Sequence, residues 1–482
     1  MAFTTRRQFV HATAFAAAAL STNPAKALEA VLDADQAPPE AASIRKFASA
    51  INGQVIAPGA PEYESSRLVF NRAFDRRPAI IVRCAAPSDV MRALEFARNH
   101  NLPVAVRGGG HSRAGFGTCD AGLVIDFSRM KRVQVDAGKR SGRAQAGALV
   151  RDFDQAMRPF GLATTLGGCP TVGIAGLTLG GGEGILMSKH GAACDNLLSA
   201  SVVTVDGKEL EVSRASNPDL FWAIRGGGGN FAIATSFEFQ LHPVGEVLSG
   251  ALAYSAPHIS DMLHAFARFA LAAPDELNIF GEILPSAQGN RFLVHGCYDG
   301  KPSLGNDLLN PLRAPVRPQD DTFRAMPYPE AQAAGFVPAP FAHFQTNLFL
   351  PQLDHAEIEK IKTAIENAAP PQFRILIIPF YGAVVRVGIG DTAFALRQPG
   401  FEVDMLGSWG NPNEKDAAVR WVKALRDALR PHAHGTYVNQ LGETSEELAR
   451  MAYGPNYARL AEIKMKYDPA NVLRINLNIK PA

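Results

Sequence analysis

The chain has 482 residues, 47% of them hydrophobic and 20% charged, an ordinary globular composition with length enough for two or three domains. Its formal net charge of +2 gives no excess of basic residues, which excludes the charge signature of a nucleic-acid-binding protein. We therefore expect a small-molecule substrate and no nucleic acid as partner.

The first 27 residues have the features of an export signal. The twin arginine of Thr5-Arg6-Arg7-Gln8-Phe9-Val10 precedes an alanine-rich apolar run and the small residues of Ala25-Lys26-Ala27. This order predicts a twin-arginine (Tat) signal peptide and a periplasmic or secreted protein, with a plain N-terminal helix as the alternative. The apolar run is too short to span a bilayer. Removal of residues 1–27 takes away three basic residues and no acidic one, which lowers the net charge from +2 to −1.

The segment after the signal predicts alternating strands and helices. Residues 78–84, 102–106, 122–127 and 132–135 favour strands, and 88–100 has helical periodicity behind a Pro87-Ser88-Asp89 start signal. The strand at 102–106 leads directly into a glycine run. We therefore expect this run to lie at the end of a strand.

Two glycine-rich loops each carry a nucleophilic side chain. The first is Arg107-Gly108-Gly109-Gly110-His111-Ser112, and the second is Gly167-Gly168-Cys169-Pro170-Thr171-Val172-Gly173. Glycines allow backbone N–H groups to approach a ligand closely, and loops of this kind suit a pyrophosphate. A histidine and a cysteine in such loops indicate a cofactor that is bound covalently as well as cradled, which points to flavin chemistry.

The frequency of glycine runs and the length of the predicted elements change near residue 244. Before it lie a glycine-rich turn at 176–184, a hairpin around Asp206-Gly207, a helix that ends in four glycines at 226–229, and a strand over 233–241. From 244 to about 411 the strands and helices are longer and glycine runs are fewer. A helix over 413–429 and a tail rich in aromatic, Asn and Gly residues follow. The middle segment therefore predicts a separate α+β domain.

The five cysteines are Cys84, Cys119, Cys169, Cys194 and Cys297. No CxxC pair occurs, which argues against zinc or iron–sulfur ligation, and we expect no metal site. Disulfides are permitted in an exported protein, but an odd count leaves at least one cysteine unpaired. Cys169 is the candidate because of its loop, with an inert buried cysteine as the alternative.

Together these motifs resemble the berberine-bridge-enzyme-like branch of the flavin oxidases with a vanillyl-alcohol-oxidase-type FAD domain. That branch includes oligosaccharide oxidases and other alcohol-oxidising enzymes, and the resemblance covers nearly all of the chain after the signal. Besides the two loops, it is carried by Gly180-Gly181-Gly182-Glu183-Gly184, Cys194-Asp195-Asn196-Leu197, Asp219-Leu220-Phe221-Trp222-Ala223, Arg225-Gly226-Gly227-Gly228-Gly229-Asn230-Phe231, Tyr453-Gly454-Pro455-Asn456-Tyr457-Ala458-Arg459-Leu460, Lys466-Tyr467-Asp468-Pro469-Ala470-Asn471-Val472 and Asn476-Leu477-Asn478-Ile479.

The resemblance implies an α+β fold with a two-part PCMH-type FAD-binding domain. The first part would span 28–245, a substrate domain 246–425, and a C-terminal segment that returns to the FAD 426–482. The resemblance also implies FAD bound doubly, through His111 to the flavin 8α-methyl group and through Cys169 to ring carbon C6. The further residues expected at the cofactor are Arg107, Gly108, Gly109, Gly110, Ser112, Val172, Gly173, Gly176, Asn439, Asn476 and Asn478.

The reaction centre is expected at Tyr437 and Asp404. Oxidation of an alcohol needs a base near the substrate O–H, and Tyr437-Val438-Asn439 resembles the Y-x-N segment beside the flavin in this branch. Because a tyrosine near its free pKa of about 10 is a poor base at neutral pH, we expect a partner that accepts its proton. Asp404 is the first choice of partner. Glu402, two residues away on the same strand face, is the second.

The predicted function is an exported FAD oxidase that acts on a hydroxyl group, with a sugar or oligosaccharide as one substrate class. In the branch that the chain resembles, a small residue at the position of Val172, near the expected flavin face, goes with oxidase behaviour, so the resemblance implies O2 as acceptor and H2O2 as product. Oxidation of a phenolic or alkaloid-like metabolite (including oxidative ring closure), a dehydrogenase with another acceptor, and a non-catalytic flavin carrier are the alternatives. The aromatic residues that could stack on a substrate are Phe341, Phe344, Phe380 and Tyr381. Oligomeric state is left open.

Overall fold

The computed structural model describes residues 39–334, 340–367, 370 and 372–482. The predicted signal peptide lies outside these ranges. Within them, no helix is both long enough and apolar enough to cross a membrane.

The N-terminal part holds two sheets that share one core. Parallel pairing of β2 and β3 with β4 builds a four-stranded sheet in the order β1-β2-β4-β3, and an antiparallel sheet has the order β5-β6-β10-β8-β9. The strands are β1 (Gln54–Ile56), β2 (Ile80–Arg83), β3 (Val104–Arg107), β4 (Leu123–Asp126), β5 (Val133–Asp136), β6 (Ser141–Gln145), β8 (Leu197–Val203), β9 (Glu209–Ser213) and β10 (Ile233–Gln240), with the short pair β7 (Leu162–Ala163) and β11 (His242–Pro243). The predicted hairpin around Asp206-Gly207 is confirmed as β8 and β9.

Short helices cover this part. They are α3 (Ala41–Ala50), α4 (Tyr63–Ser66), α5 (Pro87–Asn99), α6 (Val150–Met157), α7 (Ile174–Leu179), α8 (Met187–His190) and α9 (Pro218–Ala223). Helix α5 begins with Pro87 at its first position, where the missing N–H costs nothing, and it buries Val90, Ala93, Leu94 and Ala97.

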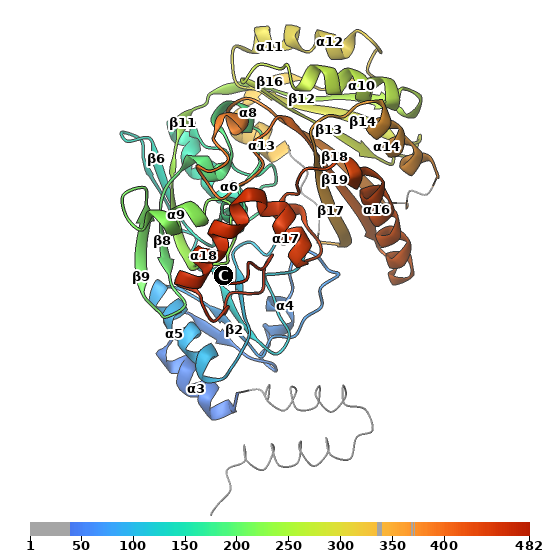
Figure 1. Ribbon diagram of the computed structural model, residues 1–482. Helices are drawn as coiled ribbons and strands as arrows, with labels where there is room; N and C mark the ends of the chain where they lie inside the picture. The colour runs from blue at the N-terminus through green and yellow to red at the C-terminus, as the bar shows by residue number, and fades with distance from the viewer. Residues whose placement is uncertain (1–38, 335–339, 368–369, 371) are drawn as a thin grey trace, which may run out of the picture.

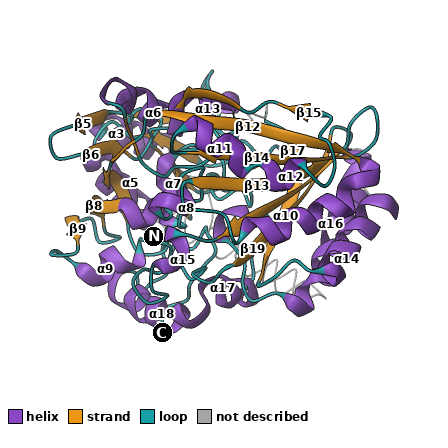
Figure 2. Ribbon diagram, turned by 90° about the horizontal axis from the view of Figure 1, so that it is seen from above, coloured by secondary structure: helices purple, strands orange, loops and turns teal. Residues whose placement is uncertain are grey.

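The middle part is one large sheet in the order β15-β12-β14-β13-β18-β19-β17, with β16 also paired to β12. Its strands are β12 (Glu246–Ser255), β13 (Leu277–Leu284), β14 (Arg291–Tyr298), β15 (Asp320–Asp321), β16 (Arg324–Pro327), β17 (Ala342–Leu350), β18 (Phe373–Phe380) and β19 (Gly400–Trp409). Its helices are α10 (Ile259–Ala270), α11 (Pro302–Leu308), α12 (Asn310–Arg313), α13 (Tyr328–Ala334), α14 (His355–Asn367), α15 (Ala383–Arg386) and α16 (Lys415–Leu429). Figure 2 shows α10, α14 and α16 together on one side of this sheet.

Alternation along the strands decides which side chains face those helices. On β13, Leu277, Ile279 and Ile283 pack in the helix-covered core, whereas Asn278, Phe280 and Glu282 line a cavity on the opposite face. On β18, Ile375 and Ile377 likewise alternate with Arg374 and Leu376. The period of two thus creates a mixed polar and aromatic face directed at the N-terminal part.

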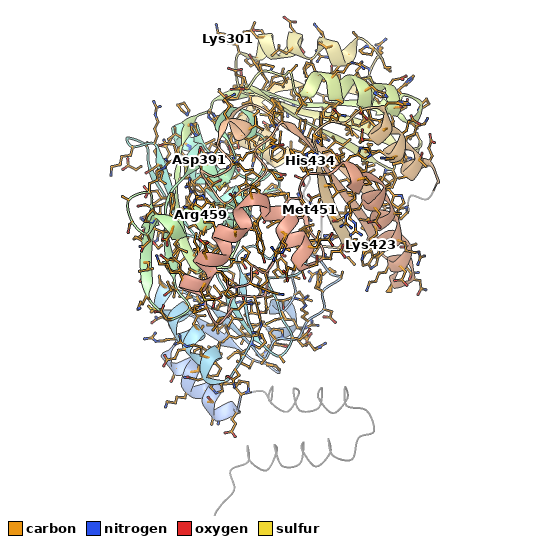
Figure 3. The ribbon with its side chains drawn as sticks, viewed as in Figure 1. Lys301, Asp391, Lys423, His434, Met451 and Arg459 are labelled. Carbon is orange, nitrogen blue, oxygen red and sulfur yellow. The ribbon has the colours of Figure 1, made fainter. Side chains whose placement is uncertain are left out.

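The C-terminal segment returns to the N-terminal part through α17 (Glu446–Tyr453) and α18 (Tyr457–Tyr467), drawn in red in Figure 1. Leu460, Leu477 and Ile479 join the core that contains Phe221 and Phe237. The guanidinium of Arg459, labelled on α18 in Figure 3, lies 3.9 Å from the ring centroid of Trp222 on α9. The α+β fold is therefore that of the sequence analysis. The expected boundary after residue 425 falls within α16, which packs in the middle-domain core as far as Leu429.

Candidate functional site

A cavity of about 740 Å³ lies between the glycine loops of the N-terminal part, the open face of the large sheet and the C-terminal segment. This volume is within the usual range for ligand sites, roughly 300–1,000 Å³. His111, Cys169, Val172 and Tyr437 all line the cavity. The fold therefore brings residues from three distant stretches of sequence to one site.

The two predicted glycine loops are in direct backbone contact. A Cβ atom on Gly109 would meet the amide nitrogen of Gly173, and a Cβ on Gly173 would meet that of Gly109. Gly110 has φ +73°, a conformation that favours glycine. Only glycine permits this approach, so the loops are fixed against each other.

His111 and Cys169, the expected attachment points, both face the cavity. The His111 ring stacks on Phe70 with centroids 4.1 Å apart. Burial, and secondarily the charge of Arg113, lower the pKa of His111 to about 4. The imidazole is therefore neutral at pH 7, which is the nucleophilic form. Cys169 is half-buried, and its Sγ lies 3.3 Å from Thr171 Oγ1.

Arg107 and Ser112 support the first loop. The Arg107 guanidinium donates to Asp126 Oδ2 and to the carbonyl of Ser66, both at 2.6 Å. Ser112 Oγ accepts from the Phe116 N–H at 3.2 Å. Arg107 and Ser112 were expected at the cofactor. Both line the cavity, but the hydrogen bonds described here stabilise the loop.

The three asparagines expected at the cofactor take different positions. Asn439 and Asn476 line the cavity, and the buried Asn476 Oδ1 has no hydrogen-bond partner among the described residues. Asn439 Nδ2 donates to Leu177 O and to Tyr437 Oη, at 3.0 and 2.8 Å. Asn478 is not in contact with the cavity. Its buried Oδ1 also has no hydrogen-bond partner among the described residues.

These features fit a bound FAD. A Cβ at Gly168, Gly176 or Gly229 would meet no atom within 4 Å, so the backbone at these lining positions is open to a ligand. Val104, Val106, Leu177 and Leu179 supply apolar walls, and Asn476 Oδ1 offers an unused acceptor. Glycine backbone, apolar walls and a few polar groups suit a planar ring system joined to a pyrophosphate.

Tyr437 is buried beside the third glycine turn. Its phenolic oxygen accepts hydrogen bonds from Gly182 N at 3.0 Å and from Asn439 Nδ2. Burial raises the pKa of Tyr437 well above its usual value, and the charges of Glu183 and Glu402 add to the rise. The phenol is therefore protonated at neutral pH.

Asp404 does not pair with Tyr437. Within the described part of the chain its hydrogen bond is from Gln345 Nε2 to Oδ2, at 2.7 Å, and Gln345 also donates to Gln440 Oε1 at 2.8 Å. Arg113 Nε donates to the same Gln440 oxygen at 3.2 Å. The Asp404 carboxylate is thus engaged by Gln345, and the carboxyl groups whose charges raise the pKa of Tyr437 are those of Glu183 and Glu402. Asp404 belongs to a network that reaches the cavity through Gln440 and Arg113.

Burial raises the pKa of Asp404 to about 6, against the lowering effect of the Arg374 and Arg113 charges. Its side chain leaves β19 on the same face as Glu402, as the period of two requires. Leu376 and Asn347 are its cross-strand neighbours.

The open sheet face adds residues that sequence reasoning missed. His295 Nε2 lies 2.8 Å from Glu282 Oε2, and the His295 ring stacks on Phe280 at 4.6 Å. Arg374 Nη1 lies 3.8 Å from Glu282 Oε1. The alternation of side chains along β13 and β18 indicates which residues of one strand share a face. Which residues of neighbouring strands meet on that face depends on the strand register, which the sequence does not reveal.

Of the four aromatic residues expected at the substrate, Phe341 alone lines the cavity. Phe380 packs in a separate core cluster, and Tyr381 donates its hydroxyl proton to Leu277 O. Phe344 lies under the ammonium group of Lys423. The other phenylalanines and tyrosines that line the cavity are Phe70, Phe116, Phe127, Phe280, Tyr437 and Tyr453.

The described residues contain no cluster of three or more His, Cys, Asp or Glu side chains that could hold a metal ion. All five cysteines are free. His343 is buried, and burial lowers its pKa to about 3.

Comparison with known proteins agrees with this site. A family model described as FAD binding domain matches residues 78–213, and one described as berberine and berberine like matches residues 436–480. The FAD-linked oxidoreductase YgaK of Bacillus subtilis, itself uncharacterized, is 32% identical over 89% of this chain and 97% of its own length. The (R)-6-hydroxynicotine oxidase of Paenarthrobacter nicotinovorans is 28% identical over 89% of this chain and 97% of its own.

Among solved structures, the xylooligosaccharide oxidase of Myceliophthora thermophila C1 in complex with xylobiose superimposes with a TM-score of 0.82. The two sequences are 26% identical, and the match covers 91% of this chain and 99% of the other.

Proposed function

Because the chain belongs to the berberine-bridge-enzyme-like FAD-linked oxidoreductases, we propose that it is an exported oxidase that carries FAD on both His111 and Cys169 and oxidises a substrate hydroxyl group. The observation that carries this proposal is the single cavity in which His111, Cys169 and Tyr437 meet below the polar face of the large sheet.

The loop geometry supports double attachment. Contact between Gly109 and Gly173 holds His111 and Cys169 on two loops that cannot move apart independently. The lowered pKa of His111 keeps its imidazole neutral, the form that would bond to the flavin 8α carbon. Cys169 forms no disulfide, so its thiol is available for the second bond.

The residues around the cavity support a hydroxyl-bearing substrate. When bound, the flavin supplies the hydride acceptor, at N5. Tyr437, which lines the cavity, is the residue that we propose as acceptor of the hydroxyl proton. Gln440 and Arg113 present an amide and a guanidinium on the same wall, held by Gln345 and Asp404, and these groups can orient further substrate hydroxyls.

A sugar or oligosaccharide is the substrate class that we favour. Asn278, Glu282 and His295 offer hydrogen-bond partners for hydroxyl groups, and Phe280 and Phe341 offer faces on which a sugar ring can stack. The similarity to a xylooligosaccharide oxidase supports this choice. The similarity to a 6-hydroxynicotine oxidase supports the second candidate, an alkaloid-like amine or phenol, because the same aromatic rings can stack on a planar heterocycle.

Anaerobic flavin bleaching tests the proposal. We expect one of a panel of mono- and oligosaccharides, aryl alcohols and cyclic amines to reduce the flavin, and air to restore its colour with release of H2O2. Bleaching by amines alone would replace the sugar proposal by the second candidate, and reoxidation only by an added dye would identify a dehydrogenase. Val172 is the small residue that we propose beside the flavin face at which O2 reacts, so fast reoxidation by air would agree with this role.

Export is tested separately. In the intact precursor, Arg6→Lys combined with Arg7→Lys should keep the protein in the cytoplasm of a bacterium with a Tat system. Unchanged export of this double variant would contradict the signal assignment.

A further inference from the structure

The arginines that line the cavity differ in how their charge is balanced. Among the described residues they are Arg107, Arg113, Arg324 and Arg374. Three of them lie in ion-pair distance of a carboxylate, with Asp126 beside Arg107, Glu330 beside Arg324 and Glu282 beside Arg374. Arg113 has no such partner in the part of the chain that the structure describes. Its side chain donates one hydrogen bond there, from Nε to Gln440 Oε1 at 3.2 Å.

The Arg113 side chain is held in place by two amide groups. Gln440 Oε1 accepts from Arg113 Nε and also from Gln345 Nε2, the latter at 2.8 Å. Gln345 Nε2 in turn donates to Asp404 Oδ2 at 2.7 Å. The terminal nitrogens of the guanidinium have no acceptor among the described residues, and Arg113 is half-buried in the cavity lining. These nitrogens are therefore available to a ligand in a fixed orientation.

A second positive charge, that of Arg374, lies on the same part of the wall. Leu406 on β19 is the cross-strand partner both of Arg374 on β18 and of Gln345 on β17, so the two flank it on one sheet face. At the usual strand spacing their Cα atoms are roughly 10 Å apart, and Gln345 is joined to Arg113 through Gln440. Burial, and secondarily the Arg374 charge, lower the pKa of Arg113 to about 10, so the guanidinium is still charged at neutral pH.

The acidic side chains of the cavity do not balance this charge. Among the described residues that line the cavity they are Glu183 and Glu282. Glu282 Oε2 lies 2.8 Å from His295 Nε2, and Oε1 is the atom beside Arg374. Burial raises the pKa of Glu183 to about 7, so this carboxyl group is only partly ionised at neutral pH. An anionic ligand would therefore complete the surroundings of Arg113.

We propose that Arg113 binds a carboxylate group of the substrate, so that the substrate is a hydroxy compound that bears a carboxylate. In the sugar class this is a uronic acid or an oligosaccharide that ends in one. The inference rests on the proposed function and narrows its substrate class. Guanidinium and carboxylate are both planar, so the free terminal nitrogens of Arg113 can donate two parallel hydrogen bonds to the two carboxylate oxygens. Arg374 adds a second positive charge beside the same group.

Paired substrates test this inference. Each neutral compound is compared with an analogue that bears a carboxylate: glucose with glucuronate, galactose with galacturonate, and benzyl alcohol with 4-(hydroxymethyl)benzoate. Anaerobic flavin reduction gives the limiting rate and the half-saturating concentration for each. We expect the acidic member of at least one pair to half-saturate the holoenzyme at a concentration at least about tenfold lower than its neutral partner does.

Variants of Arg113 show whether this residue causes the preference. Arg113→Gln should raise the half-saturating concentration of the acidic compound roughly 30-fold or more, with little change for the neutral one. Arg113→Lys should have an intermediate effect, because it keeps the charge but cannot form two parallel hydrogen bonds. Arg420→Gln is the matched control, since it removes the same charge at an exposed position of α16. The control should keep the wild-type preference, and all three variants should keep the wild-type flavin content.

The outcomes separate this inference from the proposed function. Preference for the neutral member of every pair would overturn the carboxylate site and leave the oxidase function intact. The same conclusion would follow if Arg113→Gln weakened acidic and neutral compounds equally, or if both Arg113 variants lost their flavin, which would place Arg113 at the cofactor.

A holoenzyme that no compound reduces would overturn the oxidase function. Titration of the oxidised holoenzyme with glucuronate and with 4-(hydroxymethyl)benzoate, followed by flavin absorbance, would then still decide whether Arg113 binds a carboxylate. We expect a saturable change in the wild type that is at least about tenfold weaker in Arg113→Gln. No change in the wild type, or the same change in both proteins, would overturn the inference.

Discussion

The backbones of Gly109 and Gly173 touch, so that a Cβ atom on either residue would overlap the amide nitrogen of the other. This contact joins the loop of His111 to the loop of Cys169. The site therefore depends on two residues that have no side chain.

Gly173→Ala should separate the loops. The added methyl group cannot be accommodated by a rotamer change, because it meets backbone on the opposite loop. We expect loss of most bound flavin, measured by absorbance of the purified protein, and a lower Tm. Gly245→Ala is the control, since a Cβ there meets nothing within 4 Å and its φ is not in the left-handed region. Equal flavin content in the two variants would contradict the account.

Cys169→Ala should leave the flavin attached through His111. The mass of the denatured protein should therefore still include one FAD, and the combined Cys169→Ala and His111→Ala variant should release it. An FAD-sized mass that is lost from Cys169→Ala alone would show that His111 forms no bond.

Tyr437→Phe should slow flavin reduction by roughly 100-fold or more, the usual size of a lost acid–base group. Rapid anaerobic mixing with a reducing substrate measures this rate. Tyr254→Phe removes another buried hydroxyl, one that donates to Leu312 O in the middle-domain core. That variant should lose about 1 kcal/mol of stability and keep the wild-type rate.

Lys464→Met should weaken both stability and flavin retention. Lys464 Nζ donates to Asn230 O at 2.7 Å, to Leu473 O at 3.0 Å and to Asp468 Oδ2 at 2.6 Å, and it is fully buried. Asn230 and Leu473 line the cavity. Since Asp468 would keep an uncompensated charge, we expect a loss of about 3 kcal/mol or more in chemical denaturation.

Lys466→Met is the control for this prediction. Lys466 lies on the same helix as Lys464 and pairs with Asp219 of α9 near the surface, so its loss should cost less than about 1 kcal/mol. Comparable losses in the two variants would mean that the buried contacts of Lys464 have no special weight.

Asp154 predicts a dependence of stability on pH. Burial raises the pKa of Asp154 to about 7 in the folded protein, from the model-peptide range near 4 when unfolded. The folded state thus binds this proton more tightly, and stability is lost as pH rises from about 4 through 7. The Tm difference between Asp154→Asn and the wild type should therefore shift in favour of the variant between pH 5 and pH 8. A difference in Tm that is the same at both pH values would contradict the raised pKa.

The sequence indicated the glycine runs with His111 and Cys169, and also the Tyr437 segment, because each motif consists of residues close together in the chain. A glycine loop at the end of a strand needs few neighbours to define it, and β3 does end at Arg107 where the loop begins. The change in glycine frequency and element length near residue 244 likewise coincides with β12, which starts at Glu246. Local composition was sufficient for the cofactor and the fold class.

The sequence did not reveal which carboxyl group acts on Tyr437. That depends on how Glu402 and Asp404, which share one strand face, lie relative to the turn of Glu183, more than 200 positions away. Glu402 and Asp404 are equivalent by periodicity, and β19 is buried throughout, so hydrophobic alternation gives no further guide. The packing of β19 against β17 and β18 pairs Asp404 with Gln345, and it buries Glu402 where its charge contributes to raising the pKa of Tyr437. Sequence alone thus determined the cofactor-binding loops, whose physics lies within a few residues. Only the tertiary structure decided the surroundings of each buried carboxyl group, because the fold brings charges and hydrogen-bond donors from distant parts of the sequence beside it.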